Sequence, residues 1–374
     1  MTLGILKEAQ NENRVAVTPD TISALQKLGI EKILVEKGAG ERAFCPDAAY
    51  AEAGAEVVSE KDVFGKADIL VKIQRMTDAQ LKQLRKGQVV IGQFNPLWEP
   101  ELVKPLHEAG VEAFSLDLLP RTTRAQAMDV LSSMATVAGY KAVLLAANHL
   151  PRFFPMFMTA AGTIKPAKVL IIGAGVAGLQ AIATARRLGA QVEAFDVRTA
   201  AKEEVLSLGA KFVEVEGAVE SEAAGGYAVE QTEEYKKKQA EAVHQHSMNA
   251  DVIICTAQIP GRKAPLIIHK ATVEGMQPGS VIIDLAASTG GNCEVTENDK
   301  IIQHKGVTVI GDSNLPSTMP RDASSMFSKN VLNFLKLMVK DGKVDLNFED
   351  DIIAATCISH EGEVISERLK QFMK

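Results

Sequence analysis

Residues 168–196 read KVLIIGAGVAGLQAIATARRLGAQVEAFD. The stretch opens on an apolar run, Val169–Ile172, which predicts a buried strand. A glycine-rich turn and an alanine-rich segment follow, and the latter predicts a helix. Gln191–Phe195 predicts a second strand. This order predicts a strand–helix–strand unit with parallel strands, the building block of a doubly wound α/β sheet.

Three glycines in the turn have the spacing G-x-G-x-x-G. Gly173 would form the tight turn, Gly175 would let the backbone approach a pyrophosphate, and Gly178 would let the helix pack closely against the strand. The pyrophosphate would lie on the free N–H groups at the start of the helix. Asp196, 18 residues after Gly178, stands where a carboxylate can accept hydrogen bonds from ribose hydroxyls. A glycine-rich turn without a ligand would explain the glycines but not this acid.

Asp196 also indicates which nucleotide is bound. A 2′-phosphate would lie against the carboxylate, and this like-charge contact favours NAD(H) over NADP(H). Arg198 keeps the alternative open, since an arginine near this position can accept a 2′-phosphate. The sequence therefore predicts NAD(H) as the nucleotide that this chain binds.

The composition is that of an ordinary α/β protein. The chain has 374 residues, enough for two domains, and 46% of them are hydrophobic and 24% charged. The net charge is −6 and there is no basic block, which argues against nucleic acid as a partner. The first residues do not resemble a signal peptide, and we find no stretch of about 18 apolar residues without charges. These features predict a cytoplasmic protein with no membrane span.

The cysteines and histidines do not suggest a metal centre. The four cysteines are scattered, without C-x-x-C spacing, and are expected to be reduced structural thiols. His244 and His246 form an H-x-H pair at the end of a charged helix, and this pattern fits a solvated helix end better than a metal site. No metal is predicted.

Strands and helices alternate along almost the whole chain, which is typical of mostly parallel sheets. We predict two doubly wound, Rossmann-like α/β domains with a ligand cleft between them. The first comprises residues 1–130 with 325–374, the second is the dinucleotide-binding domain at 140–320, and helices near 121–148 connect the two. Residues 216–239 form a long polar segment, for which a lid and a disordered surface insertion are equally compatible.

Four segments resemble one protein family. They are GILKEAQNENRVAVTP at 4–19, the glycine-rich unit from Ile171 to Asp196, IPGRKAP at 259–265 and MQPGSVIID at 276–284. By these segments the chain resembles alanine dehydrogenase and the NAD(H)-binding part of proton-translocating nicotinamide nucleotide transhydrogenase. The resemblance covers essentially the whole chain.

The two branches of this family need different residues. Alanine dehydrogenase requires acid–base chemistry, because the amino acid loses a proton from nitrogen as hydride leaves carbon. The family supplies a His and an Asp after two of its strands, and the matching positions here hold Asn95 and Ser288, which do not titrate near neutral pH. Arg14 and Lys72 resemble the substrate contacts of alanine dehydrogenase. Ion pairs within the fold would explain these two cations equally well.

The loop from Pro120 to Ser133, PRTTRAQAMDVLSS, resembles a loop of the transhydrogenase branch. From the residues alone it is the start of a helix, with Thr123 and Gln126 as a capping box and Asp129 one turn further on. A capping box does not explain the density of side-chain donors and acceptors in this loop.

The resemblance implies that this loop holds the nicotinamide end of NAD(H). Arg121 would bond the carboxamide, and Asp129 would orient Arg121 or the carboxamide. Gln126 would bridge to the nucleotide on a partner component. Ser132 belongs to the same group of side chains.

The resemblance assigns further nucleotide contacts elsewhere in the chain. Tyr140 resembles a tyrosine on the dihydronicotinamide side, and Gly226 with Tyr227 resembles a mobile lid. The residues implied along the adenosine and pyrophosphate path are Val176, Val197, Arg198 and Gln258. Ala287 and Ser288 depart from an acidic version of their loop, and no role is assigned to them.

Hydride transfer between two nicotinamides moves no proton at the reacting carbons, so it needs no general base. It needs the two C4 atoms about 3–3.5 Å apart with water excluded. We therefore predict the NAD(H)-binding component of a proton-translocating NAD(P) transhydrogenase of the Re/Si-specific type. It would pass hydride to NADP⁺ on a partner component, while a membrane-spanning component couples the transfer to proton flow.

The resemblance also implies a homodimer that is peripheral to the inner membrane on its cytoplasmic side. Two alternatives stay open. One is a self-sufficient alanine-type dehydrogenase, which would form NADH from an amino acid without a partner. The other is a non-catalytic NAD-binding module.

Overall fold

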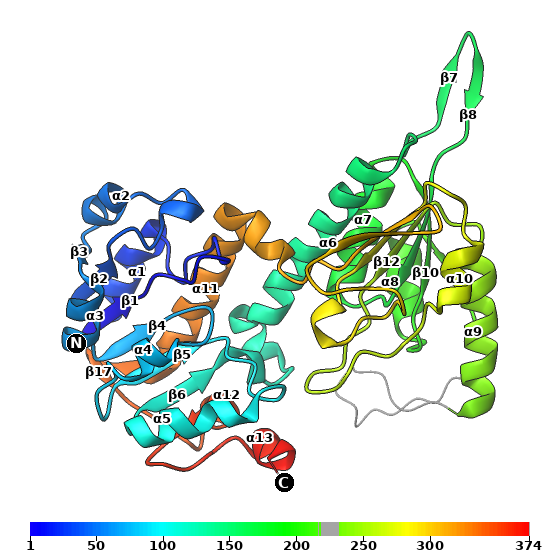
Figure 1. Ribbon diagram of the computed structural model, residues 1–374. Helices are drawn as coiled ribbons and strands as arrows, with labels where there is room; N and C mark the ends of the chain where they lie inside the picture. Colours follow the sequence, from blue (N-terminus) through cyan, green and yellow to red (C-terminus); the bar gives the residue numbers. More distant parts are fainter. Residues whose placement is uncertain (216, 218–231, 374) are drawn as a thin grey trace. The chain divides into compact units, whose positions relative to one another are not determined.

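The computed structural model describes residues 1–215, 217 and 232–373. The chain divides into two compact units (Figure 1). Unit 1 comprises Met1–Met134 and Pro316–Lys374, and unit 2 comprises Ala135–Leu315. Each unit contains a seven-stranded, mostly parallel sheet with helices packed on it. The predicted class, α/β with two doubly wound Rossmann-like sheets, is confirmed.

The sheet of unit 1 has the strand order β18-β6-β5-β4-β1-β2-β3. Neighbouring strands are parallel except for β6 and β18, which pair antiparallel. Most of these strands are short apolar runs, as expected where helices cover both faces of a sheet. The strands are β1 (Thr2–Ile5), β2 (Lys32–Glu36), β3 (Glu56–Val58), β4 (Ile69–Val71), β5 (Val89–Gly92), β6 (Glu112–Ser115) and β18 (Cys357–Ser359).

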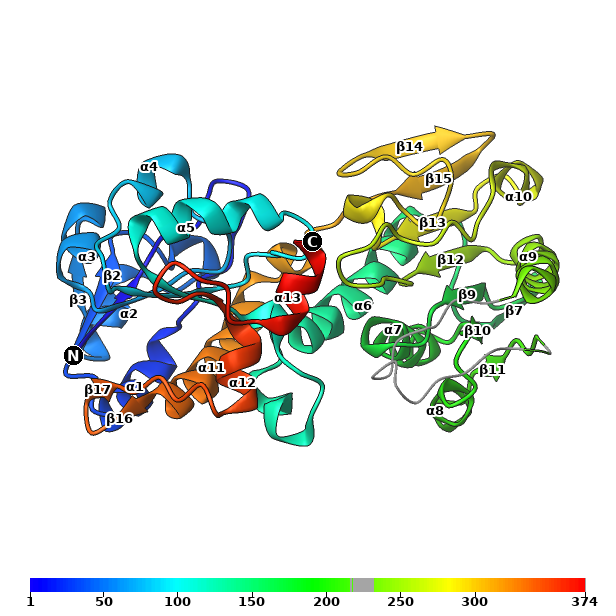
Figure 2. The ribbon, with the colours of Figure 1, turned by 90° about the horizontal axis from the view of Figure 1, so that it is seen from below.

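The helices of unit 1 cover both faces of this sheet, with α4 and α5 on one side and α1 and α11 on the other (Figure 2). The long helix α11 comes from the C-terminal region of the chain and buries Phe327, Val331 and Phe334 completely. The helices are α1 (Ile22–Lys27), α2 (Asp47–Glu52), α3 (Glu60–Lys66), α4 (Asp78–Leu81), α5 (Val103–Ala109), α11 (Pro320–Met338), α12 (Asp351–Thr356) and α13 (Glu367–Phe372). A two-stranded ribbon, β16 (Val339–Lys340) and β17 (Lys343–Val344), follows α11.

The sheet of unit 2 has the order β11-β10-β9-β12-β13-β15-β14, and only β14 is antiparallel to its neighbour. The chain runs from β9 through β10 to β11 in one direction and from β12 through β13 to β15 in the other. The carboxyl ends of β9 and β12 therefore form a topological switch point, where doubly wound sheets bind ligands. The strands are β9 (Lys168–Ile172), β10 (Gln191–Phe195), β11 (Lys211–Phe212), β12 (Val252–Cys255), β13 (Val281–Asp284), β14 (Ile301–His304) and β15 (Val307–Ile310).

Helices and one hairpin complete unit 2. Apolar side chains of β9, β10 and β12 pack against those of the helices in a continuous core. The helices are α7 (Val176–Arg187), α8 (Ala201–Ser207), α9 (Glu233–Ser247) and α10 (Lys270–Gly275). The hairpin of β7 (Phe157–Thr159) and β8 (Gly162–Ile164) extends away from the sheet of its unit (Figure 1).

Helix α6 (Val130–His149) begins in unit 1 and continues into unit 2. In unit 2 its residues Ala142, Val143 and Ala146 are completely buried in the core. A Cβ on Gly139 would lie 2.1 Å from the carbonyl oxygen of Ala177, so this glycine lets α6 cross closely over the first turn of α7. Among the described residues α6 is the one helix with the length and mean hydropathy of a membrane span, which is weak support for a span because buried core helices share these properties.

Candidate functional site

The three glycines of the turn after β9 meet three different steric demands. Gly173 has a φ of +92°, the left-handed conformation that favours glycine. A Cβ on Gly178 would lie 1.9 Å from the carbonyl oxygen of Gly173, so α7 can pack against the turn only without a side chain here. A Cβ on Gly175 would meet nothing within 4 Å. Open space therefore lies beside Gly175, where a pyrophosphate would approach.

Helix α7 begins directly at this open space. Gly175 is its N-cap residue and supplies no side-chain hydrogen bond to the first turn. The first-turn N–H groups of a helix carry partial positive charge and lack intrahelical partners, so this end of α7 is suited to an anion. Val176, the first residue of α7, is 41% exposed and offers an apolar contact at the same place.

Asp196, at the carboxyl end of β10, is tied to the glycine turn. Its Oδ2 accepts a hydrogen bond from the backbone N–H of Ala174 at 2.7 Å. Arg198 donates to the same carboxylate through Nε at 2.9 Å and Nη2 at 2.8 Å, and through its backbone N–H at 2.8 Å. These hydrogen bonds raise the pKa of the Arg198 guanidinium. Ribose hydroxyls would therefore share this carboxylate with Arg198, or replace it; Val197, between the two, is partly buried.

The carboxyl end of β12 contributes the other side of the switch point. The Thr256 hydroxyl contacts the carbonyl oxygens of Ile172 and Gly173 at 3.2 and 2.9 Å and joins the ends of β12 and β9. Gln258 is exposed, and its Nε2 donates to the carbonyl oxygen of Leu285 at 2.8 Å, which orients the side chain.

Two residues of this region were missed by sequence reasoning. The first is Thr256. The second is Asn292, which is completely buried and exchanges hydrogen bonds with the backbone of Ala257 at 2.9 and 3.0 Å. The polar residue directly after the apolar strand Val252–Cys255 was a signal for Thr256. Nothing near Asn292 in the sequence indicates its partner.

The loop that resembles the nicotinamide site lies in unit 1 and contains the 3₁₀ helix η5 (Thr123–Met128). The predicted capping box is wrong: Thr122 is the N-cap residue of η5, and no side-chain hydrogen bond caps this helix. Asp129 instead caps the start of α6. Its carboxylate accepts from the backbone N–H of Ser132 at 2.9 Å and from the Ser132 hydroxyl at 2.5 Å. The structure thus brings Asp129 and Ser132 together.

The remaining predicted nicotinamide contacts lie on exposed surfaces or outside the described residues. Arg121 and Gln126 are exposed in the loop of unit 1. Tyr140 is 37% exposed on the segment of α6 that belongs to unit 2. Gly226 and Tyr227 lie outside the described residues.

Arg14 and Lys72 form buried ion pairs within unit 1. Arg14 donates to both carboxylate oxygens of Glu12, at 2.8 and 2.6 Å, and Lys72 lies 3.2 Å from a carboxylate oxygen of Glu8. All four side chains are more than 90% buried. Burial raises the pKa of Glu8. Burial also acts on Glu12, but the hydrogen bonds and charge of Arg14 outweigh it and lower the pKa of this carboxyl.

We expect Arg14→Met to destabilise unit 1 by about 3 kcal/mol at pH 7, because Glu12 would be left as an unpaired buried charge. The lowered pKa of Glu12 means that its pair stabilises the fold above the ordinary carboxyl pKa and loses this contribution as the pH falls. The loss in the variant should therefore shrink at acid pH, where Glu12 can bind a proton. Urea unfolding at both pH values, with the exposed Lys104→Met as control, measures this. An equal small loss in both variants would refute a structural ion pair.

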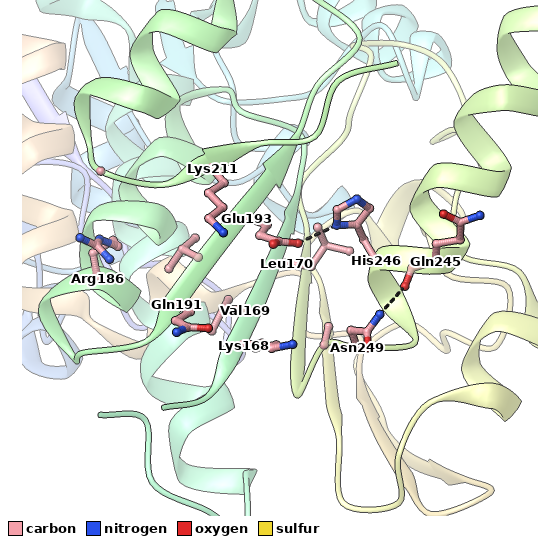
Figure 3. A pocket seen from close by; sticks show the side chains of 13 residues that line it. Lys168, Val169, Leu170, Arg186, Gln191, Glu193, Lys211, Gln245, His246 and Asn249 are labelled. Carbon is pink, nitrogen blue, oxygen red and sulfur yellow. Dashed lines mark hydrogen bonds and ion pairs between the residues drawn. The ribbon is translucent and has the colours of Figure 1, made fainter. Parts of the chain in front are cut away.

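A pocket of about 590 Å³ lies at the other edge of the sheet of unit 2 (Figure 3). Lys168 and Gln191, the first residues of β9 and β10, line it, and Glu193 accepts from or pairs with the His246 ring Nδ1 at 2.6 Å across it. The glycine turn follows the carboxyl end of β9, whereas this pocket lies at the amino ends. It is therefore separate from the switch point.

The structure offers no metal site in the ranges it describes, since no group of three or more His, Cys, Asp or Glu side chains converges there. His244 and His246 contact different partners, the Thr272 hydroxyl and Glu193. The four cysteines are free thiols.

Comparison with known proteins places these features in a family context. The family model described as "Alanine dehydrogenase/PNT, N-terminal domain" matches residues 4–138, and "Alanine dehydrogenase/PNT, C-terminal domain" matches residues 142–367. The chain is 45% identical to a Rhodospirillum rubrum protein, over 99% of both chains, and that protein is named as the first of the separate pieces of an NAD(P) transhydrogenase subunit alpha. It is 42% identical to the NAD(P) transhydrogenase subunit alpha of Haemophilus influenzae, over 98% of this chain and 72% of that protein.

Other relatives are more distant or known as structures. The alanine dehydrogenase of Mycolicibacterium smegmatis is 27% identical over 98% of this chain and 95% of its own length. The crystal structure of a transhydrogenase from Sinorhizobium meliloti is similar with a TM-score of 0.89 and 43% identity, over 97% of this chain and all of that chain. An L-alanine dehydrogenase structure shares the fold, with a TM-score of 0.84 at 24% identity.

Proposed function

The chain belongs to the alanine dehydrogenase/PNT family, in the branch of the NAD(P) transhydrogenase alpha subunits, and we propose that it is the NAD(H)-binding component of such an enzyme. NADH bound by this chain passes hydride to NADP⁺ held by a separate component. A membrane-spanning component couples this transfer to proton translocation. The transfer is of the Re/Si-specific type.

The observation that carries this proposal is a dinucleotide cradle in unit 2 combined with a polar loop in unit 1 that offers no free general base. The carboxylate of Asp129 is engaged by Ser132, and the other loop side chains, Arg121 and Gln126, are a guanidinium and an amide. Such groups can fix a carboxamide without exchanging protons. Transfer between two nicotinamides requires geometry and water exclusion, and no acid or base.

The assignment of NAD(H) to this chain rests on Asp196. Its carboxylate already holds the N–H of Ala174 in the glycine turn, which places a negative charge where a 2′-phosphate would have to lie. Arg198 is paired with this carboxylate, so its charge is largely spent on Asp196. A phosphate would have to compete with that pair.

We expect Asp196→Asn to reduce the preference for NADH over NADPH at least about tenfold, because the amide keeps the contact to Ala174 but releases Arg198 for a 2′-phosphate. Fluorescence titration of both nucleotides measures the ratio. Glu193→Gln is the matched control, since it removes a carboxylate from the same strand next to the opposite edge. An unchanged ratio would remove Asp196 as the determinant of nucleotide choice.

The separate components are proposed from the lengths of the relatives. The Rhodospirillum rubrum protein, which carries the name of only the first piece of a subunit alpha, is matched over 99% of its length. The Haemophilus influenzae subunit alpha is longer, and the chain covers 72% of it. We infer that the NADP(H)-binding and membrane-spanning components are distinct from the segment described by this chain, which lies peripheral to the inner membrane on its cytoplasmic face.

A homodimer is supported by the hairpin of β7 and β8. Met158 is 77% exposed and Phe157 42% exposed, and Phe157 stacks edge-on with the exposed Phe153 at 4.6 Å between ring centroids. Apolar side chains gathered on a projecting hairpin mark an interaction site rather than a core. We infer that a second copy of this chain covers them.

We expect Phe157→Gln with Met158→Gln to convert the dimer into a monomer at micromolar concentration without loss of folding, because the hairpin lies outside the core. Sedimentation velocity measures the assembly state. Ile301→Gln, which also replaces an apolar side chain more than half exposed, is the control. A double variant that stays dimeric, or a monomeric parent chain, would place the hairpin outside any dimer interface.

The self-sufficient dehydrogenase is disfavoured by the distance to the alanine dehydrogenases, at 27% identity, and by Arg14 and Lys72. Both cations have buried carboxylate partners within unit 1. The chain alone, incubated with NAD⁺ and L-alanine, should form no NADH above the rate without alanine. Alanine-dependent NADH formation by the purified chain would overturn the proposed function in favour of this alternative.

A further inference from the structure

The loop that carries Gln126 is anchored by an ion pair from the C-terminal region of the chain. Arg124 donates to both carboxylate oxygens of Asp350, at 2.6 and 2.7 Å, and also contacts Asp351. Asp350 is at the same time the N-cap of α12, accepting from the N–H of Ile352 at 2.9 Å. The hydrogen bonds from Arg124 lower the pKa of Asp350, so this carboxylate stays ionised. The start of α12 is thereby fixed to the beginning of η5.

The far end of the same 3₁₀ helix is anchored by α11. The carbonyl oxygen of Ala127 accepts from Asn330 Nδ2 at 2.9 Å and from Asn333 Nδ2 at 3.1 Å. These two asparagines are three residues apart and therefore lie on one face of α11. Gln126 thus stands between two fixed points, Arg124 before it and Ala127 after it.

Stability alone does not account for these contacts. An exposed ion pair such as Arg124 with Asp350 adds little to folding stability. Asn330 is 6% exposed, and within the ranges that the structure describes its Oδ1 has no hydrogen-bond partner, which is unfavourable for a buried acceptor. The amide cannot turn over to relieve this, because its oxygen would then face the carbonyl oxygen of Ala127. The asparagine is therefore held at a cost in order to fix Ala127.

We propose that Arg124, Asp350, Asn330 and Asn333 form a loop clamp whose role is to position Gln126 for hydride transfer. The inference rests on the proposed function, in which Gln126 bridges to the second nucleotide. The clamp residues bind other regions of unit 1 and act through the loop, so they are positioning residues. Because a misplacement of about 1 Å can slow a reaction about a hundredfold, a loop fixed on both sides of Gln126 is an arrangement that hydride transfer requires.

The test compares Arg124→Gln, Asp350→Asn and Asn333→Ala with the parent chain. Asn can still cap α12, so Asp350→Asn removes the charge and keeps the helix start. Each protein is loaded with NADH and mixed with a purified NADP(H)-binding transhydrogenase component carrying NADP⁺, and single-turnover transfer is followed. The dissociation constant for NADH and the melting temperature are measured in parallel. Lys329→Gln, on the exposed face of α11, is the control.

The clamp predicts at least about tenfold slower transfer in the variants, with NADH affinity within about twofold and little change in melting temperature. Arg124→Lys should recover some of the rate, since one of the two hydrogen bonds to Asp350 can re-form. Variants that transfer hydride as fast as the parent and the control would overturn the clamp and leave the proposed function intact. A parent chain that binds NADH and transfers nothing would overturn both. If Arg124→Gln fails to fold, Asp350→Asn decides.

Discussion

Gln126→Asn is expected to slow hydride transfer to NADP⁺ about a hundredfold while NADH affinity stays within about twofold. Gln126 is exposed in the loop of unit 1, so its side chain adds little to folding. Asparagine keeps the amide but withdraws it by one methylene. A bridge to the second nucleotide would be broken by this change, whereas an anchor for NADH would fail in binding. Single-turnover transfer and an NADH titration on the same preparation separate the two.

Gln26→Asn, the same substitution on the exposed side of α1, is the control for the shortened amide. It should leave both quantities unchanged. If binding falls in parallel with the rate in Gln126→Asn, Gln126 is a cofactor anchor. If neither quantity changes, the loop of unit 1 has no role in the transfer.

The second large effect is expected from the glycine turn, where two equal substitutions should fail in different ways. Gly178→Ala places a Cβ 1.9 Å from the carbonyl oxygen of Gly173, so α7 must move away from β9. We expect a loss of at least about 3 kcal/mol in folding free energy, at the upper end of overpacking effects. Gly175→Ala meets nothing within 4 Å and should fold normally, but its methyl group enters the space of the pyrophosphate.

Chemical denaturation and NADH titration of both variants measure this difference. Gly175→Ala should retain the unfolding midpoint of the parent and bind NADH at least about tenfold more weakly. A Gly175→Ala chain with the NADH affinity of the parent would show that the nucleotide does not approach this turn. Normal stability in Gly178→Ala would contradict the close packing of α7 against the turn.

The nucleotide unit of unit 2 was predictable because its information is local. The strand at Val169–Ile172, the turn after it and the strand at Gln191–Phe195 lie within about thirty residues of one another and follow one another in the fold. The left-handed φ of Gly173 and the steric need for Gly178 are consequences of that short connection. Asp196 was likewise identified by its spacing alone.

The loop of unit 1 was predicted less well because its partners are distant in sequence. Thr123 and Gln126 have the spacing of a capping box, yet the loop forms a 3₁₀ helix that Thr122 precedes without a side-chain cap. Arg124 is fixed by Asp350, 226 positions away, which no local pattern reveals. Local propensity gave way here to long-range hydrogen bonds. The ion pairs of Arg14 and Lys72 with nearby glutamates were foreseen as an alternative, and the structure contains them.

The most direct test of the central claim mixes the purified chain with a purified NADP(H)-binding transhydrogenase component and follows reduction of a spectrally distinct NAD analogue by NADPH. The proposed function predicts transfer in the mixture and none with either protein alone, because each holds one of the two nucleotides. A folded chain that binds NADH yet supports no transfer in the mixture would contradict the claim and leave a nucleotide-binding module without catalytic function.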